Sequence, residues 1–110
     1  MISFLVPSGR RFLRGGVVMS VDIRTLAKEF SLTEETLRKE SLRAFLLEQL
    51  RTLDAERRAR CAKFGATTLA EMDELVRQGM VPEEEILEDF QHVDYLTTRV
   101  ARVKALLEEL

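Results

Sequence analysis

The 110-residue chain has no tryptophan, a single histidine, a single cysteine, two prolines and five glycines. Because Cys61 stands alone, it can form neither an internal disulfide nor a thiolate metal site, which is typical of a protein of the reducing cytoplasm. The scarcity of proline and glycine favours long helices over sheets or disorder. There is no phosphate-binding loop, no zinc-ligand set and no Ser/His/Asp spacing of a hydrolase. No segment approaches the roughly 20 apolar residues of a membrane span. We therefore expect no enzyme, no metal, no cofactor and no membrane partner.

What the chain does have is an uneven distribution of charge. The first 63 residues carry 13 basic and 8 acidic side chains, whereas the remaining 47 carry 4 basic and 11 acidic ones. Such a division suggests that the two halves bind different partners, for instance an anionic polymer and a basic protein surface. It is equally compatible with the two halves pairing with each other, and both interpretations stay open from the sequence.

Residues 1–18, MISFLVPSGRRFLRGGVV, differ from the rest of the chain. Their apolar stretch is too short for a secretory signal and precedes its arginines, which is the reverse of a signal peptide. They are either a leader without structure or an upstream extension of a chain whose translation starts at Met19. Residues 19–110 are predicted to form a single helical domain.

Four helices are predicted from local signals. Asp22 can cap a short helix that runs to Phe30, and Thr33 can cap a long one that runs from about residue 34 to residue 64. Gly65 is a natural stop after the long helix. Thr68 with Glu71 forms a capping-box pattern for a third, short helix.

Gly79 ends the third helix, and Pro82 suits the first turn of the last one. The last helix carries an apolar stripe with alternating spacings of four and three residues, formed by Ile86, Phe90, Val93, Thr97, Val100 and Leu107. Lys104 interrupts this stripe, and Leu96, Val103, Leu106 and Leu110 widen it. Two long helices joined by a short one predict an all-α fold, a long antiparallel hairpin with a short elbow helix. We further expect a homo-oligomer, most simply a dimer, through a leucine-rich face of the long helix, made of Leu42, Phe45, Leu46, Leu50 and Leu53.

In this hairpin the basic end of the first long helix lies beside the acidic start of the last helix. Intramolecular pairing is then one explanation of the charge division, with Arg57, Arg58, Arg60 and Lys63 facing Glu83, Glu84, Glu85, Glu88 and Asp89. The other explanation is an exposed surface for a basic partner protein. Its candidate residues are Glu84, Glu85, Glu88 and Asp89, with Phe90 and Tyr95 as apolar anchors.

The segment TLAKEFSLTEETLRKESL, residues 25–42, resembles the helix-turn-helix of prokaryotic regulators. Ala27 stands where the first helix must be small, Leu37 is the apolar contact of the second helix, and Ser31 replaces the usual turn glycine. In another alignment VVMSVDI and FSLTEETLRKESLRAFL resemble the strand and second helix of a ribbon-helix-helix. Either resemblance implies DNA binding, for which the candidates are Arg38, Lys39 and Arg43.

The segments RCAKFGATTLAEMDELVRQGMV and EEEILEDFQHVDYLTTRVARVKALLEEL resemble small helical antitoxins of prokaryotic toxin–antitoxin pairs. This resemblance implies a non-enzymatic inhibitor whose acidic C-terminal half covers a cationic surface of a partner toxin. The alternative is a structural or scaffold helical module that binds no nucleic acid. Asp89 and His92, three residues apart, could form half of a metal site, but the chain lacks a second Glu-x-x-His pair to complete it.

Overall fold

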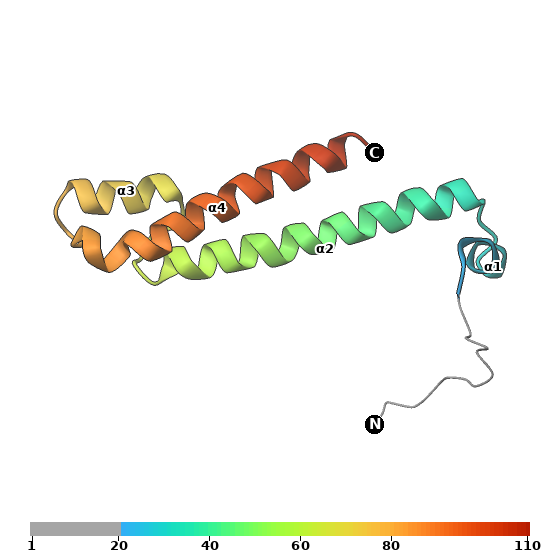
Figure 1. The fold of residues 1–110 in the computed structure, drawn as a ribbon, viewed down its shortest axis with the longest axis horizontal. Helices are drawn as coiled ribbons and strands as arrows, with labels where there is room; N and C mark the ends of the chain where they lie inside the picture. The colour runs from blue at the N-terminus through green and yellow to red at the C-terminus, as the bar shows by residue number, and fades with distance from the viewer. Residues whose placement is uncertain (1–20) are drawn as a thin grey trace, which may run out of the picture. The chain divides into compact units, whose positions relative to one another are not determined.

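A computed structural model describes residues 21–110 and shows four helices and no strand within that range. The helices are α1 (Ile23–Glu29), α2 (Glu34–Ala62), α3 (Leu69–Arg77) and α4 (Glu83–Glu108) (Figure 1). The predicted all-α class is therefore confirmed. Contacts divide the chain into two compact units, Met1–Arg38 and Lys39–Leu110. The single helical domain of residues 19–110 stays a prediction. The predicted leader, residues 1–18, lies outside the described residues.

The helix starts of the first unit follow the predicted caps. The Asp22 carboxylate accepts a hydrogen bond of 2.8 Å from the backbone N–H of Thr25, which holds the pKa of Asp22 below its usual value. The Thr33 hydroxyl accepts one of 3.0 Å from the N–H of Thr36. Each side-chain oxygen satisfies a donor that the first turn of a helix leaves without a partner.

Helices α1, α2 and α3 all end in the same backbone motif. The residue after the cap is Ser31, Gly65 or Gly79, and each has a positive φ, of 58°, 73° and 73° respectively. In each case the next residue donates its N–H to the carbonyl five positions back, a Schellman ending. Ser31 thus occupies a left-handed position that glycine takes in the other two, at a backbone cost of about 1–2 kcal/mol.

The second unit is a hairpin of α2 and α4 with α3 as its elbow (Figure 1). The Thr68 hydroxyl accepts from the N–H of Glu71 at 3.1 Å, as predicted. The carboxylate of Glu71 reaches back to the N–H of Thr67 at 2.8 Å, one residue earlier than in a regular capping box. Pro82 is the N-cap of α4 rather than a residue of its first turn.

The core of the hairpin lies at the elbow, where three helices meet. Its fully buried side chains include Cys61, Met72, Ile86 and Val93, and the Cys61 sulfur lies 3.7 Å from the Met72 sulfur. This burial raises the pKa of the Cys61 thiol, which keeps it protonated and unreactive. Each fully buried side chain of this size stabilises the fold by about 1.5–3 kcal/mol.

The buried stripe of α4 differs from the predicted one. Its members are spaced by three and four residues in a heptad pattern and are Ile86, Asp89, Val93, Leu96, Val100 and Val103. Phe90 is only partly buried and packs against the elbow core, and Thr97 is exposed, so the prediction was wrong for these two positions. The same spacing recurs on α2 in half-buried positions, Leu46, Leu50, Leu53, Arg57 and Arg60. The hairpin thus faces a heptad-spaced buried stripe of α4 with half-buried positions of the same spacing on α2, and α3 packs on the core at the elbow.

Among the helices of residues 21–110, none combines the length and the apolar composition that a bilayer crossing demands.

Candidate interaction surfaces

A buried carboxylate joins the two long helices of the hairpin. Asp89 on α4 is only 7% exposed. Its oxygens accept hydrogen bonds from Arg60, in the last turn of α2, at 2.8 Å and from Lys63, just after the end of α2, at 2.9 Å. The hydrogen bond from Lys63, followed by that from Arg60, holds the pKa of Asp89 below its usual range. Because Asp89 occupies a heptad position, this polar contact favours one register of α4 on α2 over its neighbours.

The polar contacts continue along the same side of the hairpin. Glu56 lies 3.5 Å from Nε of Arg60, and its other contact is Nε2 of His92 at 2.8 Å. The ring of His92 meets that of Tyr95 edge-on, with centroids 6.2 Å apart. Asp89 therefore binds Arg60 and Lys63, whereas His92 binds Glu56. Within residues 21–110 no group of three or more potential ligands could hold a metal ion.

The predicted pairing of the basic and acidic runs holds only in part. Arg60 and Lys63 bind Asp89, but Arg57 and Arg58 bind Asp54 of their own helix, at 2.9 and 3.0 Å. Arg57 also donates to the carbonyl oxygen of Thr67 at 2.9 Å, which ties the loop before α3 to α2. In the part of the chain that the structure describes, no ion pair involves Glu83, Glu84, Glu85 or Glu88.

These free carboxylates leave an acidic surface at the start of α4. Glu84, Glu88 and Tyr95 follow one another at spacings of four and seven residues, which places them on one outward face of the helix. Glu85 is exposed beside them, and Tyr95 is 58% exposed. We call Glu84, Glu85, Glu88 and Tyr95 the acidic face. Asp89 and Phe90, which the sequence also placed in the partner surface, turn instead toward α2 and the elbow core.

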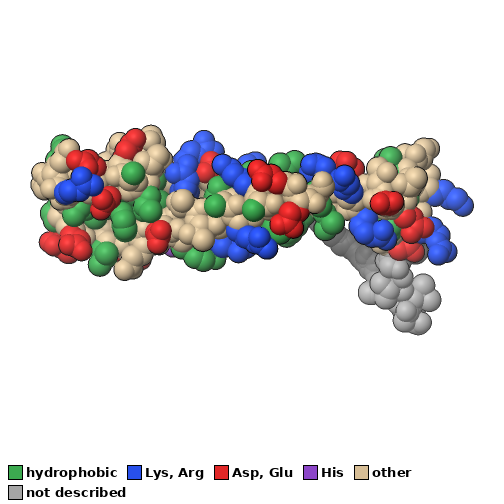
Figure 2. Space-filling view, turned by 90° about the horizontal axis from the view of Figure 1, so that it is seen from above, with side chains coloured by type: hydrophobic (Ala, Val, Ile, Leu, Met, Phe, Trp, Pro, Cys, Tyr) green, Lys and Arg blue, Asp and Glu red, His purple; other side chains and the backbone are tan. Residues whose placement is uncertain are grey.

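Apolar side chains are exposed close to the acidic face. Met80, before α4, is 67% exposed and Leu87 is 43% exposed. A notch of about 100 Å³ between α3 and α4 is lined by Val76, Ile86, Leu87 and Phe90, with Asp73 and Glu83 at its edge. Figure 2 shows acidic and apolar side chains intermingled at the end of the hairpin that carries α3. Sequence reasoning missed the exposure of Met80 and Leu87, although Leu87 stands outside the heptad positions of α4.

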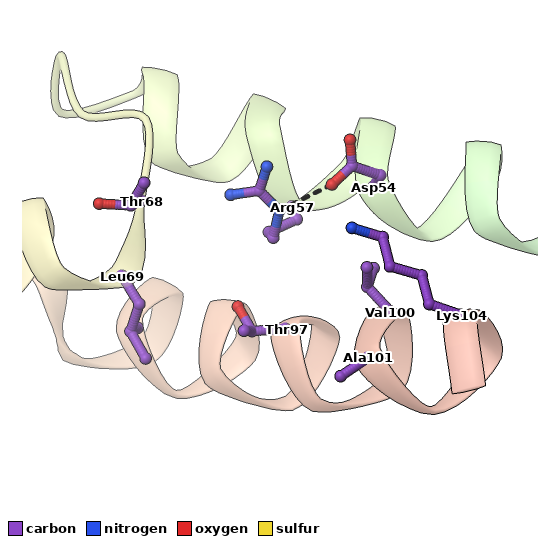
Figure 3. A pocket seen from close by; sticks show the side chains of 8 residues that line it. All are labelled: Asp54, Arg57, Thr68, Leu69, Thr97, Val100, Ala101 and Lys104. Carbon is purple, nitrogen blue, oxygen red and sulfur yellow. Dashed lines mark hydrogen bonds and ion pairs between the residues drawn. The ribbon is translucent and has the colours of Figure 1, made fainter.

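A larger groove of about 350 Å³ runs between α2, the start of α3 and α4 (Figure 3). Its floor is apolar, with Leu69, Val100 and Ala101, and its walls carry Asp54, Arg57 and Lys104. The hydrogen bond from Arg57 holds the pKa of Asp54 below its usual value. The two charged side chains Asp54 and Arg57 in the groove thus bind each other, at 2.9 Å.

The comparison with protein families gives one result. A family model described as the uncharacterized protein MJ0235 family matches residues 19–110. The chain belongs to the MJ0235 family. No curated protein and no solved structure is significantly similar to it.

In this MJ0235-family chain, the leucine-rich face predicted for oligomerisation is divided between two environments. Leu46, Leu50 and Leu53 are half-buried on the side of α2 that α4 covers. Leu42 and Phe45 are exposed, at 50% and 62%. The first three therefore pack at least in part within the hairpin, whereas Leu42 and Phe45 leave half or more of their side chains exposed.

The candidate DNA-binding residues all lie on α2. Arg38 and Lys39 are exposed and Arg43 is half-buried, and no ion pair among the described residues involves any of them. Ala27 and Leu37 are buried. Ile23, which the ribbon-helix-helix alternative placed in a strand, begins α1 instead.

Proposed function

We propose that this MJ0235-family protein is a non-enzymatic binding protein of the antitoxin kind, which neutralises a partner protein by covering a basic surface on it. The observation that carries the proposal is the acidic face, where Glu84, Glu85 and Glu88 form no ion pair with any residue of 21–110, while the neighbouring Asp89 binds Arg60 and Lys63. Charges that the fold does not need are well placed to steer and orient a partner of opposite charge.

The residues around the acidic face supply the apolar contacts that a stable complex needs in addition to charge. Carboxylates at a rim affect association rate and specificity more than affinity, so a stable complex requires buried apolar contacts. Tyr95 lies in line with Glu84 and Glu88, and Met80 and Leu87 are exposed nearby. The partner surface that fits is thus basic with an apolar centre, in keeping with a toxin whose cationic surface would otherwise meet RNA.

The direct test takes as the partner a small protein encoded next to this one, which an antitoxin is expected to have. Its expression alone should stop growth of a bacterial host, and co-expression of the full chain should restore growth and yield a complex. The triple variant Glu84→Gln, Glu85→Gln and Glu88→Gln should bind it at least about 10-fold more weakly, mainly through slower association. Its melting temperature should stay nearly unchanged because exposed charges contribute little to stability.

The matched control is the variant Glu40→Gln, Glu108→Gln and Glu109→Gln, which removes the same charge from exposed positions of the hairpin elsewhere. It should bind like the wild type. Equal weakening by both triple variants would mean that only net charge matters and would remove the acidic face from the interface. A neighbour that is harmless and does not bind would contradict the antitoxin proposal and leave the scaffold alternative.

DNA binding is the second candidate, and the left-handed Ser31 between α1 and α2 favours it, since that is where the resembling regulators carry glycine. We propose Arg38, Lys39 and Arg43 as the contacts, with Glu34 and Glu35 opposing them at the helix start. Affinity for the DNA upstream of the gene should fall steeply with salt. Arg38→Glu should abolish the shift, whereas Arg99→Glu should not. Absence of any salt-dependent shift, with and without the partner, would exclude this role.

A further inference from the structure

The apolar core of the hairpin is closed at one end and open at the other. At the elbow, α3 covers α2 and α4, and Met72, Ile86 and Val93 are fully buried. Away from the elbow, α2 and α4 are the only helices within the unit Lys39–Leu110, and a two-helix layer leaves part of its apolar side chains in contact with water. Leu46 is half-buried there, and Leu42 and Phe45 are exposed.

Helical spacing identifies the side on which this apolar surface lies. Phe45, Gln49, Thr52 and Glu56 follow one another at four, three and four residues, so they share one side of α2. Glu56 contacts His92, which marks the adjoining side of α4, and Leu106 lies two heptads after His92 on that side. We call Leu42, Phe45, Leu46, Leu106 and Leu110 the Phe45 face. Leu47 lies elsewhere, in line with Asp54 and Cys61 on the side of the groove and of α3.

The charge around the Phe45 face suits a second copy of the same chain. Residues 39–54 of α2 carry three basic side chains, Lys39, Arg43 and Arg51, and three acidic ones, Glu40, Glu48 and Asp54. This part of α2 has no net charge, and residues 97–110 at the end of α4 add three basic and two acidic side chains. The region therefore carries both signs in nearly equal number, so two copies meet with little repulsion. A basic partner of the kind that fits the acidic face gains no charge complementarity here.

We propose that two copies of the chain pair through their Phe45 faces about a two-fold axis near Phe45, with their α2 helices antiparallel. In a parallel pair the unpaired carboxylates of both elbows would lie together, and like charges without counter-ions repel. The antiparallel arrangement places the two acidic faces at opposite ends. Four helices then surround Leu42, Phe45 and Leu46, and each copy supplies the cover that the other lacks.

The pairing stands on observations of α2 and of the open end, and it does not depend on the proposed partner at the acidic face. If both hold, each dimer presents two partner sites, one at each end. Measuring oligomeric state without any partner keeps the two proposals separate, because failure of one leaves the result of the other unaffected.

Sedimentation equilibrium on the full chain tests the face. The wild type should be a dimer at micromolar concentration, and Phe45→Glu should weaken self-association at least about 100-fold by placing two charges in an apolar interface. Leu47→Glu is the matched control, since Leu47 is also about half exposed and lies two residues away on the other side of α2. It should leave the dimer intact. A monomeric wild type, or dissociation by Leu47→Glu but not by Phe45→Glu, would overturn the proposal.

A short bismaleimide cross-linker tests the orientation. Ser41 and Gln49 lie four residues before and after Phe45, so antiparallel pairing brings Ser41 of one copy beside Gln49 of the other. A mixture of the single variants Ser41→Cys and Gln49→Cys should cross-link mainly as the mixed pair, while the buried Cys61 stays unmodified. Cross-linking of Ser41→Cys mainly to itself would show a parallel pair and overturn the arrangement. A wild-type dimer without cross-links at either position would exclude the Phe45 face.

Discussion

Five carboxylates occupy the first two turns of α4, and only Asp89 among them lies inside the hairpin. A buried carboxylate is tolerated when charged donors surround it, and Arg60 and Lys63 provide them while keeping their own side chains partly in water. The same helix therefore carries one acid for the fold and several for the surface. At this scale, structural and binding roles are divided between neighbours of similar chemistry.

Replacing Asp89 by Asn should reduce the free energy of unfolding by about 1–3 kcal/mol near neutral pH, because the amide loses the charged hydrogen bonds. The pKa of Asp89 is lower in the folded state, so the stabilisation is present above the unfolded value of about 4 and is lost as pH falls through the folded value. Thermal unfolding followed by circular dichroism between pH 2 and 7 should show the gap between wild type and variant closing below about pH 4. Glu85→Gln should show almost no gap at any pH, and a gap for Asp89→Asn that stayed constant down to pH 2 would contradict the role assigned to Asp89.

At the scale of the helix, α4 shows why the buried stripe of a helix is harder to predict than the helix itself. Thr97 and Leu96 are neighbours, and both fit an apolar stripe with spacings of three and four residues. Both stripes begin at Ile86, and the choice depends on whether the first spacing after it is three residues, to Asp89, or four, to Phe90. Asp89, a charged residue, proved to be a member, and excluding it from the sequence pattern shifted two positions by one residue each. The physical reason is that Arg60 and Lys63 compensate its burial, which no property of α4 alone reveals.

The heptad assignment predicts opposite outcomes for these neighbours. Leu96→Ala should cost about 2–5 kcal/mol because it leaves a cavity in a fully buried position. Thr97→Ala should change stability by less than about 0.5 kcal/mol because its side chain is exposed. Urea denaturation of both variants measures the difference. Similar losses of stability for the two variants would mean that the buried stripe runs between Leu96 and Thr97, and this would reject the heptad assignment.

At the scale of the whole hairpin, burial decreases from the elbow to the open end. The three-helix core at the elbow holds the fully buried side chains, whereas Leu46, Leu50 and Leu53 are half-buried. Local stability follows the density of buried apolar contacts, so the ends of α2 and α4 far from the elbow should open first. Self-association through the Phe45 face would reinforce the weaker end.

Amide hydrogen exchange should therefore be slowest around Cys61, Met72 and Val93 and faster around Leu106. At concentrations where the wild type is dimeric, amides near Phe45 should gain protection of about 10-fold or more over the Phe45→Glu variant, as mass action stabilises the bound form. The Leu47→Glu variant serves as the reference for any local effect of a new charge. Uniform exchange along α4 would contradict the gradient from the elbow to the open end.

Helix positions in this chain depend on signals that act within a few residues. Asp22, Thr33 and Thr68 cap the first turns, and Gly65 and Gly79 supply left-handed endings, so the sequence alone was enough to place four helices and a hairpin. Each of these residues bonds to, or shapes, backbone within about five positions of itself. Such interactions can be predicted from the sequence without knowing which residues lie on the neighbouring helix.

The use of each charged residue depended on residues distant in the chain. Arg58 and Arg60 are similar side chains on one helix, yet Arg58 binds Asp54 and Arg60 binds Asp89, 29 positions away. Likewise Leu46 faces α4 while Leu42 and Phe45 remain exposed, although all three belong to one leucine-rich run. The neighbouring helix and its register determine which side of a helix is covered. Only the packed hairpin therefore separates the charges and leucines that hold the fold from those left free to bind another molecule.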